Sequence, residues 1–459
     1  MEKAAQEAVK KIGQRLLSEA NDLKRTFQSI ASELDIDIDR LNRITQGKAS
    51  FAETMSIAQL FAENYPVRLG DLVLDFSDHS NGIKIMRAED SELSGRIFDR
   101  AGKDGNRTPY YEYRDTATAK ISPFKPEWIK ELRIVNNSDP ENPDVAYNNG
   151  HFLHQMTAFI GPVNFYWEVD GKKFCKEMDT GSSNYITPFC KHSFTSRDPG
   201  HEAIIIAVTF AAAAGKARNE LYDLGTETIS SYILNNRDHK AGVAQLIKQL
   251  MMDRCLTQAH LTELAARRHI NLDCNVLLSV NTEKPQSQLD ALAEILNVPA
   301  SLFELPEHTP DNEVVVKDRN PQDRYAYNSD LSNPDYLIDA LAGTKRMPSM
   351  QGFNFEICTS SIENASELES SLHSYIYNYG DSILSIEWSH DGSLKGDILQ
   401  PGDSCYLEPF VKHRFARHGE SNANLFVFRV SGEVDLTVQK EISSFARAER
   451  IIESTTWFD

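Results

Sequence analysis

The chain has 459 residues, more than the roughly 100–200 residues of one domain, so two or more folded cores are expected. Hydrophobic residues make up 41% and charged residues 25%, which excludes a disordered or fibrous chain. The 48 Lys and Arg against 67 Asp and Glu give a formal net charge of −19, which disfavours non-specific binding to nucleic acid or anionic lipid. Any anionic ligand therefore needs a local positive pocket.

The first predicted element is a charged amphipathic helix over residues 1–20, which lacks the apolar core of a secretory signal. No later segment stays apolar for the length of a membrane-spanning helix, so we expect a cytoplasmic protein without membrane contact. The cysteines are scattered and form no CxxC pair, which favours reduced thiols in packed positions. They are Cys175, Cys190, Cys255, Cys274, Cys358 and Cys405.

Two helical segments share one pattern. The stretch "FQSIASELDIDIDRLNRI" at 27–44 resembles "LTELAARRHINLDCNVLL" at 261–278 in apolar spacing, and another short helical stretch follows each. Short helices broken by a turn at this spacing predict helix-turn-helix units. The first unit carries four acidic residues against two arginines in "SELDIDIDRLNRIT", so we expect a packing role and no nucleic-acid partner.

The chain also repeats itself in its β-like regions. "GSSNYITPFCKHSF" at 181–194 and "GDSCYLEPFVKHRF" at 402–415 are identical at eight of fourteen ungapped positions, and a β-like apolar run follows each. Repeats on this scale indicate duplication of a folded unit.

Short apolar or alternating runs separated by Gly, Asp, Asn and Pro predict a small antiparallel barrel or jelly roll in each half. The fold class is therefore mainly β with helical modules. We expect a helix-turn-helix module at 1–75, a catalytic β domain at 76–235, a degenerate helix-turn-helix module at 236–305 and a second β domain without metal ligands at 306–459. The polar, Pro-containing segment 306–324 is expected to be a connection that crosses the surface.

The chemistry-bearing residues lie in the first β domain. His151 and Gln155 are on one run and His192 follows a turn on another, and a small barrel can bring such groups together at its mouth. Two imidazoles and one oxygen ligand leave three positions of an octahedral iron open. Aligning the repeat places Ser370 and Ser374 opposite His151 and Gln155, so the second β domain is predicted to be structural.

These residues carry a family resemblance. The pattern N-x-G-H-x3-(E/Q) followed by G-x6-P-x3-H resembles the paired motifs of cupin domains (double-stranded β-helix jelly rolls). The duplicated helix-turn-helix and cupin arrangement is similar to that of the non-haem iron enzymes acting on hydroxyalkylphosphonates. The resemblance covers nearly the whole chain and implies Fe(II) as the cofactor.

The resemblance also implies how the third metal ligand varies. Dioxygenase members of the family use a Glu six residues before the last His, and Ile186 occupies that position here. The epoxidase member uses a Glu four residues after the first His, where this chain has Gln155. A Gln at that position marks the synthase members. Because an amide is neutral, it leaves the iron one charge more positive and favours a dianionic phosphonate.

Substrate-binding residues are likewise implied by position. A lysine of the helical module, contributed by a neighbouring subunit of a homo-oligomer, paired tyrosines and an asparagine three before the first His bind the phosphonate in the family. A family arginine precedes the tyrosines, and the loop length here leaves two candidates open. The matching residues are Lys24, Tyr111, Tyr113, Asn148 and either Arg100 or Arg107. Charge-assisted hydrogen bonds from such groups provide the required local positive pocket.

The implied activity converts 2-hydroxyethylphosphonate and O2 into methylphosphonate and carbon dioxide or bicarbonate. One alternative is the dioxygenase outcome, which gives hydroxymethylphosphonate and formate. An alternative of another class is a cupin-type transcriptional regulator, which would bind DNA without turnover.

Overall fold

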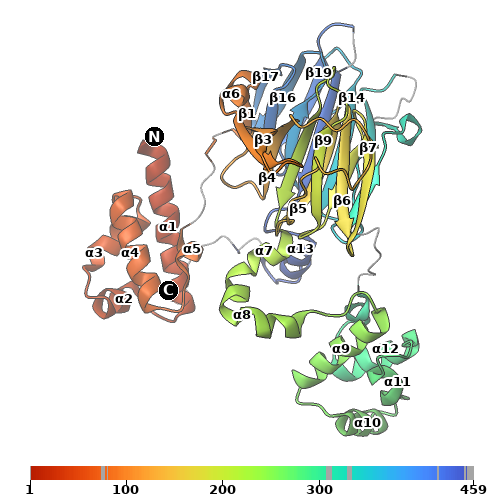
Figure 1. Ribbon diagram of the computed structural model, residues 1–459. Helices are drawn as coiled ribbons and strands as arrows, with labels where there is room; N and C mark the ends of the chain where they lie inside the picture. The colour runs from red at the N-terminus through yellow and green to blue at the C-terminus, as the bar shows by residue number, and fades with distance from the viewer. Residues whose placement is uncertain are drawn as a thin grey trace. The chain divides into compact units, whose positions relative to one another are not determined.

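A computed structural model describes residues 2–73, 78–79, 81–305, 313–327, 333–420, 423–448 and 451. It combines helices with four β-sheets (Figure 1). The chain divides into two compact units. One comprises Met1–Lys84, Ala119–Ser122 and Val434–Asp459, and the other comprises Ile85–Thr118 and Pro123–Glu433.

The first unit is built on short capped helices. Thr26, Asp37 and Ser50 each accept a hydrogen bond from a backbone N–H of the helix that follows, which fixes where α2, α3 and α4 begin. Ile12, Ile44 and other apolar side chains fill the space between the helices. The helices predicted at 27–44 are present. The elements are α1 (Glu2–Asp22), α2 (Phe27–Glu33), α3 (Ile38–Thr45), α4 (Phe51–Asn64), α5 (Leu69–Leu72) and α13 (Leu436–Ile442).

A second helical group lies within the other unit. Its core includes Ile247, Leu261, Leu277 and Leu292, and the helices expected around 261–278 are α10 and α11. None of the described helices combines the length and apolar character needed to cross a bilayer. The elements are α7 (Ala212–Lys216), α8 (Arg218–Tyr232), α9 (His239–Met252), α10 (Gln258–Arg267), α11 (Cys274–Leu278), α12 (Gln286–Leu296) and η1 (Ala300–Phe303).

The first β sandwich pairs a seven-stranded sheet, in the order β11-β8-β5-β10-β4-β3-β2, with a three-stranded sheet, β7-β6-β9. Phe159, Phe165, Phe194 and Ile205 form its core. Its strands are β2 (Arg96–Ala101), β3 (Arg107–Asp115), β4 (Phe124–Glu131), β5 (His154–Ile160), β6 (Val163–Val169), β7 (Lys172–Met178), β8 (Ser183–Ile186), β9 (Lys191–Ser196), β10 (Ile204–Phe210) and β11 (Val314–Lys317).

The second β sandwich has the corresponding order, β1-β18-β15-β20-β14-β13-β12 with β17-β16-β19. Helix α6 (Ala88–Leu93) follows β1, and η3 (Pro321–Asp323) precedes β12. Its strands are β1 (Ile83–Met86), β12 (Tyr325–Tyr327), β13 (Tyr336–Ala340), β14 (Met350–Ile357), β15 (His373–Asn378), β16 (Leu384–His390), β17 (Ser393–Leu399), β18 (Ser404–Leu407), β19 (Lys412–Arg417) and β20 (Ala423–Val430).

The two sandwiches contact each other through matching hydrogen bonds. The backbone N–H of Ala117 donates to the hydroxyl of Ser404 at 2.9 Å, and that of Ala342 donates to the hydroxyl of Ser183 at 2.7 Å. Ser183 and Ser404 are equivalent positions of the sequence repeat. The same contact is therefore made twice, once in each direction.

Each sandwich also includes a strand from the segment that precedes the other sandwich in sequence. Strand β11 precedes the second sandwich in sequence but pairs with β8 of the first, with Val314 opposite Ile186. The prediction of a surface connection over 306–324 is therefore wrong for Val314–Lys317, whereas the described residues 318–324 are mostly exposed and lie outside any strand. The β-branched run Val314, Val315, Val316 forms a strand despite its polar surroundings.

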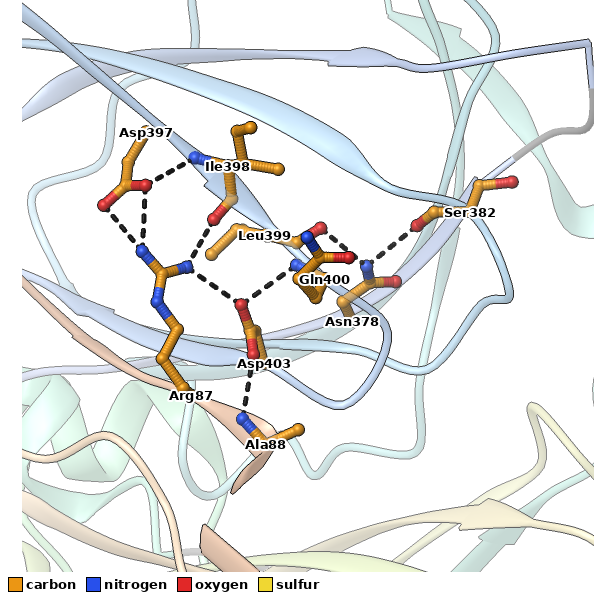
Figure 2. A network of polar contacts seen from close by, with 9 residues as sticks. All are labelled: Arg87, Ala88, Asn378, Ser382, Asp397, Ile398, Leu399, Gln400 and Asp403. Atoms are coloured by element: carbon orange, nitrogen blue, oxygen red, sulfur yellow. Dashed lines mark hydrogen bonds and ion pairs between the residues drawn. The ribbon is translucent and has the colours of Figure 1, made fainter. Parts of the chain in front are cut away.

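The reciprocal attachment follows β1. Arg87 donates to both carboxylate oxygens of Asp397 at 2.9 Å and to Asp403 at 2.9 Å, and the N–H of Ala88 donates to Asp403 at 2.8 Å (Figure 2). Asp403, only 1% exposed, also accepts from the N–H of Gln400 at 2.9 Å. One carboxylate thus joins the chain ahead of the first sandwich to the turn between β17 and β18 of the second.

Candidate metal and substrate site

The loop before β5 holds His151 against the turn before β9. Gly150 has a φ of 71°, and a Cβ there would lie 2.4 Å from the carbonyl carbon of Phe189, so this position requires glycine. The N–H of Phe189 donates to the carbonyl of His151 at 2.8 Å. The Asn-x-Gly-His pattern therefore serves to bring the His151 backbone against the β8–β9 turn.

His192 lies at the start of β9 and is 4% exposed. Its Nδ1–H donates to the carbonyl of Cys190 at 2.9 Å, which leaves a lone pair on Nε2. That Nε2 accepts from the side-chain amide of Asn148 at 3.0 Å. Burial lowers the pKa of His192 to about 4, which keeps the imidazole neutral at physiological pH.

Gln155 points its amide oxygen toward His151. Its amide nitrogen donates to the hydroxyl of Thr157 at 2.9 Å, and its oxygen lies 3.1 Å from Nε2 of His151. The ring centroids of His151 and His192 are 5.4 Å apart, and the two ring planes are nearly perpendicular, at 86°. The structure thus brings the three predicted ligands together.

This arrangement fits a divalent transition metal. Two imidazole nitrogens and an amide oxygen are donors that Fe(II) accepts. Nδ1 of His151 is buried and has no hydrogen-bond partner among the described residues. Among the described residues no group of three His, Cys, Asp or Glu could hold a metal, and the amide oxygen of Gln155 is the third candidate donor beside the two imidazoles.

Tyr113 of β3 is near one of the two candidate arginines. Burial raises the pKa of Tyr113, the charges of Glu127 and Glu131 raise it further, and the charge of Arg100 opposes them. Arg100 is half-buried, whereas Arg107 is exposed and donates to the backbone carbonyl of Asp99. Of the two candidate arginines, Arg100 is the one whose charge acts on Tyr113.

Tyr111 is placed differently. It is 6% exposed, its hydroxyl accepts from the N–H of Phe194 at 3.1 Å and lies 3.3 Å from the hydroxyl of Ser193. Tyr336 of the second sandwich accepts from the N–H of Phe415 at the same distance. The shared bond indicates a structural role for Tyr111, as an anchor between β3 and β9.

The chain is similar to known proteins over nearly its whole length. No family model matches the chain. The methylphosphonate synthase of Nitrosopumilus maritimus (strain SCM1) is 36% identical over 456 residues, which cover 97% of this chain and 95% of that protein. The chain belongs to the methylphosphonate synthase family.

Solved structures agree with this membership. Streptomyces albus HEPD with 2-hydroxyethylphosphonate and Fe(II) bound superposes with a TM-score of 0.84 at 29% identity, covering 98% of this chain and 99% of that one. A variant of 2-hydroxyethylphosphonate dioxygenase superposes with a TM-score of 0.74 at 17% identity, covering 95% and 98%, and shows the shared fold.

The second sandwich of this methylphosphonate synthase family member provides an internal comparison. The N–H of Phe410 donates to the carbonyl of Ser370 at 2.7 Å, as Phe189 does to His151. His413 donates through Nδ1 to the carbonyl of Val411 at 2.8 Å, as His192 does to Cys190. The aligned positions are therefore equivalent in space, and only one of the three donors is retained.

The remaining sequence-predicted residues are placed as follows. Lys24 lies in the turn between α1 and α2 of the first unit, with a φ of 59°. His154 is half-buried, with its Nδ1 2.8 Å from the hydroxyl of Tyr185 and its ring stacked on Phe210. Cys190 is buried, as expected for a small core residue, and the six cysteines are free, although Cys255 is exposed.

Glu127 and Thr157 are two further residues that the sequence pattern did not single out. Burial raises the pKa of Glu127, and its electrostatic interactions with Arg96 and His151 oppose that rise. Strand alternation could have found it, because Glu127 and Glu131 share the face of the core residue Ile129 in β4. Thr157 follows Gln155 by two residues and so shares its face in β5.

Proposed function

We propose that this protein converts 2-hydroxyethylphosphonate and O2 into methylphosphonate and either carbon dioxide plus water or bicarbonate, using a single Fe(II) held by His151, Gln155 and His192. The observation that carries the proposal is the approach of these three donor groups, with the amide oxygen of Gln155 3.1 Å from Nε2 of His151. The 36% identical relative is a methylphosphonate synthase, and the 29% identical structure is HEPD with 2-hydroxyethylphosphonate and Fe(II).

Fe(II), when bound, supplies open coordination positions on which substrate and O2 can meet. The protein's own residues orient the donors. The hydroxyl of Thr157 accepts from the amide nitrogen of Gln155, which orients the amide oxygen of Gln155 toward the site. The carbonyl of Cys190 accepts from Nδ1–H of His192 and so selects the tautomer whose Nε2 is unprotonated. Because Gln155 is neutral, the site keeps the charge that attracts a dianionic phosphonate.

Four residues are proposed to bind substrate. Arg100 and Tyr113, which are near enough for the charge of Arg100 to lower the pKa of Tyr113, would donate to phosphonate oxygens. The amide nitrogen of Asn148, now 3.0 Å from Nε2 of His192, would donate to a substrate oxygen once that nitrogen binds the ion. Lys24, contributed by a neighbouring subunit of a homo-oligomer, would add a further positive charge.

We also propose that each β sandwich is a cupin domain preceded by a helix-turn-helix module, with boundaries at 1–75, 76–235, 236–305 and 306–459. The matching strand orders and the α2–α4 and α10–α12 series support this assignment. Strands β1 and β11 lie in sheets of the partner sandwich and so cross these boundaries.

The helix-turn-helix modules are proposed to serve packing and substrate binding in a cytoplasmic enzyme without nucleic acid. Arg40 and Arg43, the two arginines of α3, both donate to one carboxylate oxygen of Glu53 at 3.0 Å. That shared ion pair takes both guanidinium groups away from a DNA phosphate or base edge.

The test is incubation of iron-loaded protein with 2-hydroxyethylphosphonate in air, followed by phosphorus NMR. A methylphosphonate signal that is absent with the His151→Ala variant supports the proposal. Hydroxymethylphosphonate as the main product would establish the dioxygenase outcome instead, which the similarity to HEPD favours as the second candidate. Absence of turnover with sequence-specific, salt-sensitive DNA binding would overturn both.

A further inference from the structure

The second sandwich carries a positive charge where the first has candidate metal ligands. Arg429 of β20 lies opposite Ser374 of β15, and the equivalent pair in the first sandwich is Thr209 opposite Gln155. Since residues facing one side of a sheet alternate along the strand, Arg429 shares the inward face of Ser374 as Thr209 shares that of Gln155. A guanidinium group therefore replaces a small hydroxyl at this position.

The surroundings of Arg429 differ from those of the metal site in charge. Its guanidinium carbon lies 5.6 Å from the ring centre of Phe353, which occupies the position of Glu127 in the first sandwich. Its charge also lowers the pKa of His413, a smaller effect than that of burial. The carboxyl group near the first site is thus replaced by an aromatic ring, and a cation is added.

No ion pair or hydrogen bond of the Arg429 side chain occurs within the described part of the chain, and its Nε is fully buried without a partner. Burial lowers the pKa of Arg429, while Tyr325 and Tyr327 raise it. Glu367, whose charge raises the pKa of His413, is paired with Lys412 at 2.9 Å. A largely desolvated guanidinium without a carboxylate is costly unless a ligand supplies the negative charge.

We propose that the interior of the second sandwich binds a small oxyanion, a carboxylate or a phosphate-type group, through the guanidinium of Arg429. The planar fork of an arginine matches the two oxygens of either group. The hydroxyl of Tyr325, whose pKa is raised by burial and lowered by Arg429, is the additional donor on this side. The guanidinium also repels a divalent cation, so the same residue keeps metal out of the second sandwich.

The experiment is calorimetric titration of the full-length His151→Ala protein, in which the candidate metal site of the first sandwich is disabled. Inorganic phosphate and formate are titrated separately, because the two arms distinguish a phosphate-type ligand from a carboxylate. We expect saturable binding of at least one probe at one site per chain, weakened by about tenfold or more when Arg429→Gln is added.

A second variant guards against misfolding of Arg429→Gln. Ser374→Asp keeps the arginine but gives it an internal carboxylate, and it should abolish binding while the thermal unfolding midpoint stays the same or rises. Thr209→Ser, at the equivalent position of the first sandwich, should leave binding unchanged. Absence of saturable binding of both probes to the His151→Ala protein, or an affinity in the Arg429→Gln and Ser374→Asp proteins equal to that of the His151→Ala parent, would overturn the proposal.

Discussion

At the scale of single residues, Gln155 and its neighbour across the strand pair provide a direct test of the metal site. Gln155→Ala removes an oxygen ligand, and we expect the affinity for Fe(II) to fall by about 10–100-fold. Ile186 lies directly opposite Gln155 in the β5–β8 pair, at the position where dioxygenase relatives carry a Glu. Gln155→Ala combined with Ile186→Glu should therefore regain iron and shift the product toward hydroxymethylphosphonate.

Iron content by elemental analysis and products by phosphorus NMR measure both effects. The repeat provides a matched control, because Ser374→Ala changes the equivalent residue of the second sandwich and should alter neither measurement. Unchanged iron content in the Gln155→Ala protein would remove Gln155 from the ligand set.

Glu131 makes a second residue-scale prediction. Burial alone raises its pKa well above the usual value, and both carboxyl oxygens lack a hydrogen-bond partner among the described residues. A raised pKa in the folded state contributes stability below the unfolded value of about 4.3, and this stability is lost as the pH rises toward the folded value. Glu131→Gln removes that loss, and the variant should exceed the wild type in stability at pH 8 by at least about 1 kcal/mol.

Urea unfolding at pH 4 and pH 8 measures the difference. We expect the two proteins to converge at pH 4, where the wild-type carboxyl is protonated in both states. The exposed Glu177→Gln serves as the control and should show no such pH dependence. A Glu131→Gln protein that is less stable at pH 8 would contradict this account.

At the scale of elements, the clamp that Arg87 forms after β1 should contribute measurably to stability. Arg87→Ala leaves Asp403 buried without its guanidinium partner, and we expect a loss of about 2–4 kcal/mol. Asp397, the other partner, is 39% exposed at its side chain, so Asp397→Ala should cost less than about 1 kcal/mol.

Thermal or urea unfolding compares the two variants. Adding Asp403→Asn to Arg87→Ala should recover part of the loss, since a neutral amide leaves no uncompensated charge in the buried position. Equal effects of Arg87→Ala and Asp397→Ala would show that burial of Asp403 is not what makes the clamp important.

The elements also show how far sequence alone can predict this fold. Two kinds of element were predictable because their apolar periodicity is visible within the segment itself. They are the amphipathic helices at 27–44 and 261–278 and the strands around the repeat. Strand β11 was not predictable from sequence, because its four residues lie between polar neighbours and resemble a loop. Its pairing partner, β8, lies far earlier in the chain. Glu127 and Arg429 were not predicted as inward-facing residues. A charged residue in a strand is expected to face solvent, and only the pairing register shows which side of β4 and β20 faces inward.

The approach of His151, Gln155 and His192 was predictable from the motif spacing and the repeat, and their role as ligands is proposed from the family resemblance. Sequence left Arg100 and Arg107 both open, since a β-bulge at Phe98 and Asp99 shifts the register of β2 against β3. Tyr111 and Tyr113 fit the same sequence pattern, and only the structure shows that the hydroxyl of Tyr111 accepts from the N–H of Phe194.

At the scale of the whole molecule, the two sandwiches exchange segments. We therefore expect them to stay associated after the chain between them is cleaved at a single site. With β11 in the first sheet, and Arg87 and Ala88 bound to the second sandwich, each half holds a piece of the other. A protease site inserted after Leu305 should give two fragments that stay together in size-exclusion chromatography and keep activity. Separation of the fragments without denaturant would contradict the exchange.

The proposed contribution of Lys24 from a neighbouring subunit makes a prediction that only an oligomer can meet. Lys24→Ala and His151→Ala should each abolish turnover of 2-hydroxyethylphosphonate, one by removing a phosphonate contact and the other by removing a metal ligand. In a mixed dimer with sites shared across subunits, one of the two sites then combines an intact metal set with an intact lysine.

The mixed dimer, isolated after co-expression through two affinity tags, should therefore show about half of wild-type activity, and the unseparated random mixture about a quarter. If Lys24 served the site of its own subunit, every site in the mixed oligomer would carry one of the two lesions. Activity would then stay at the level of the separate variants, and that result would assign the lysine to its own chain.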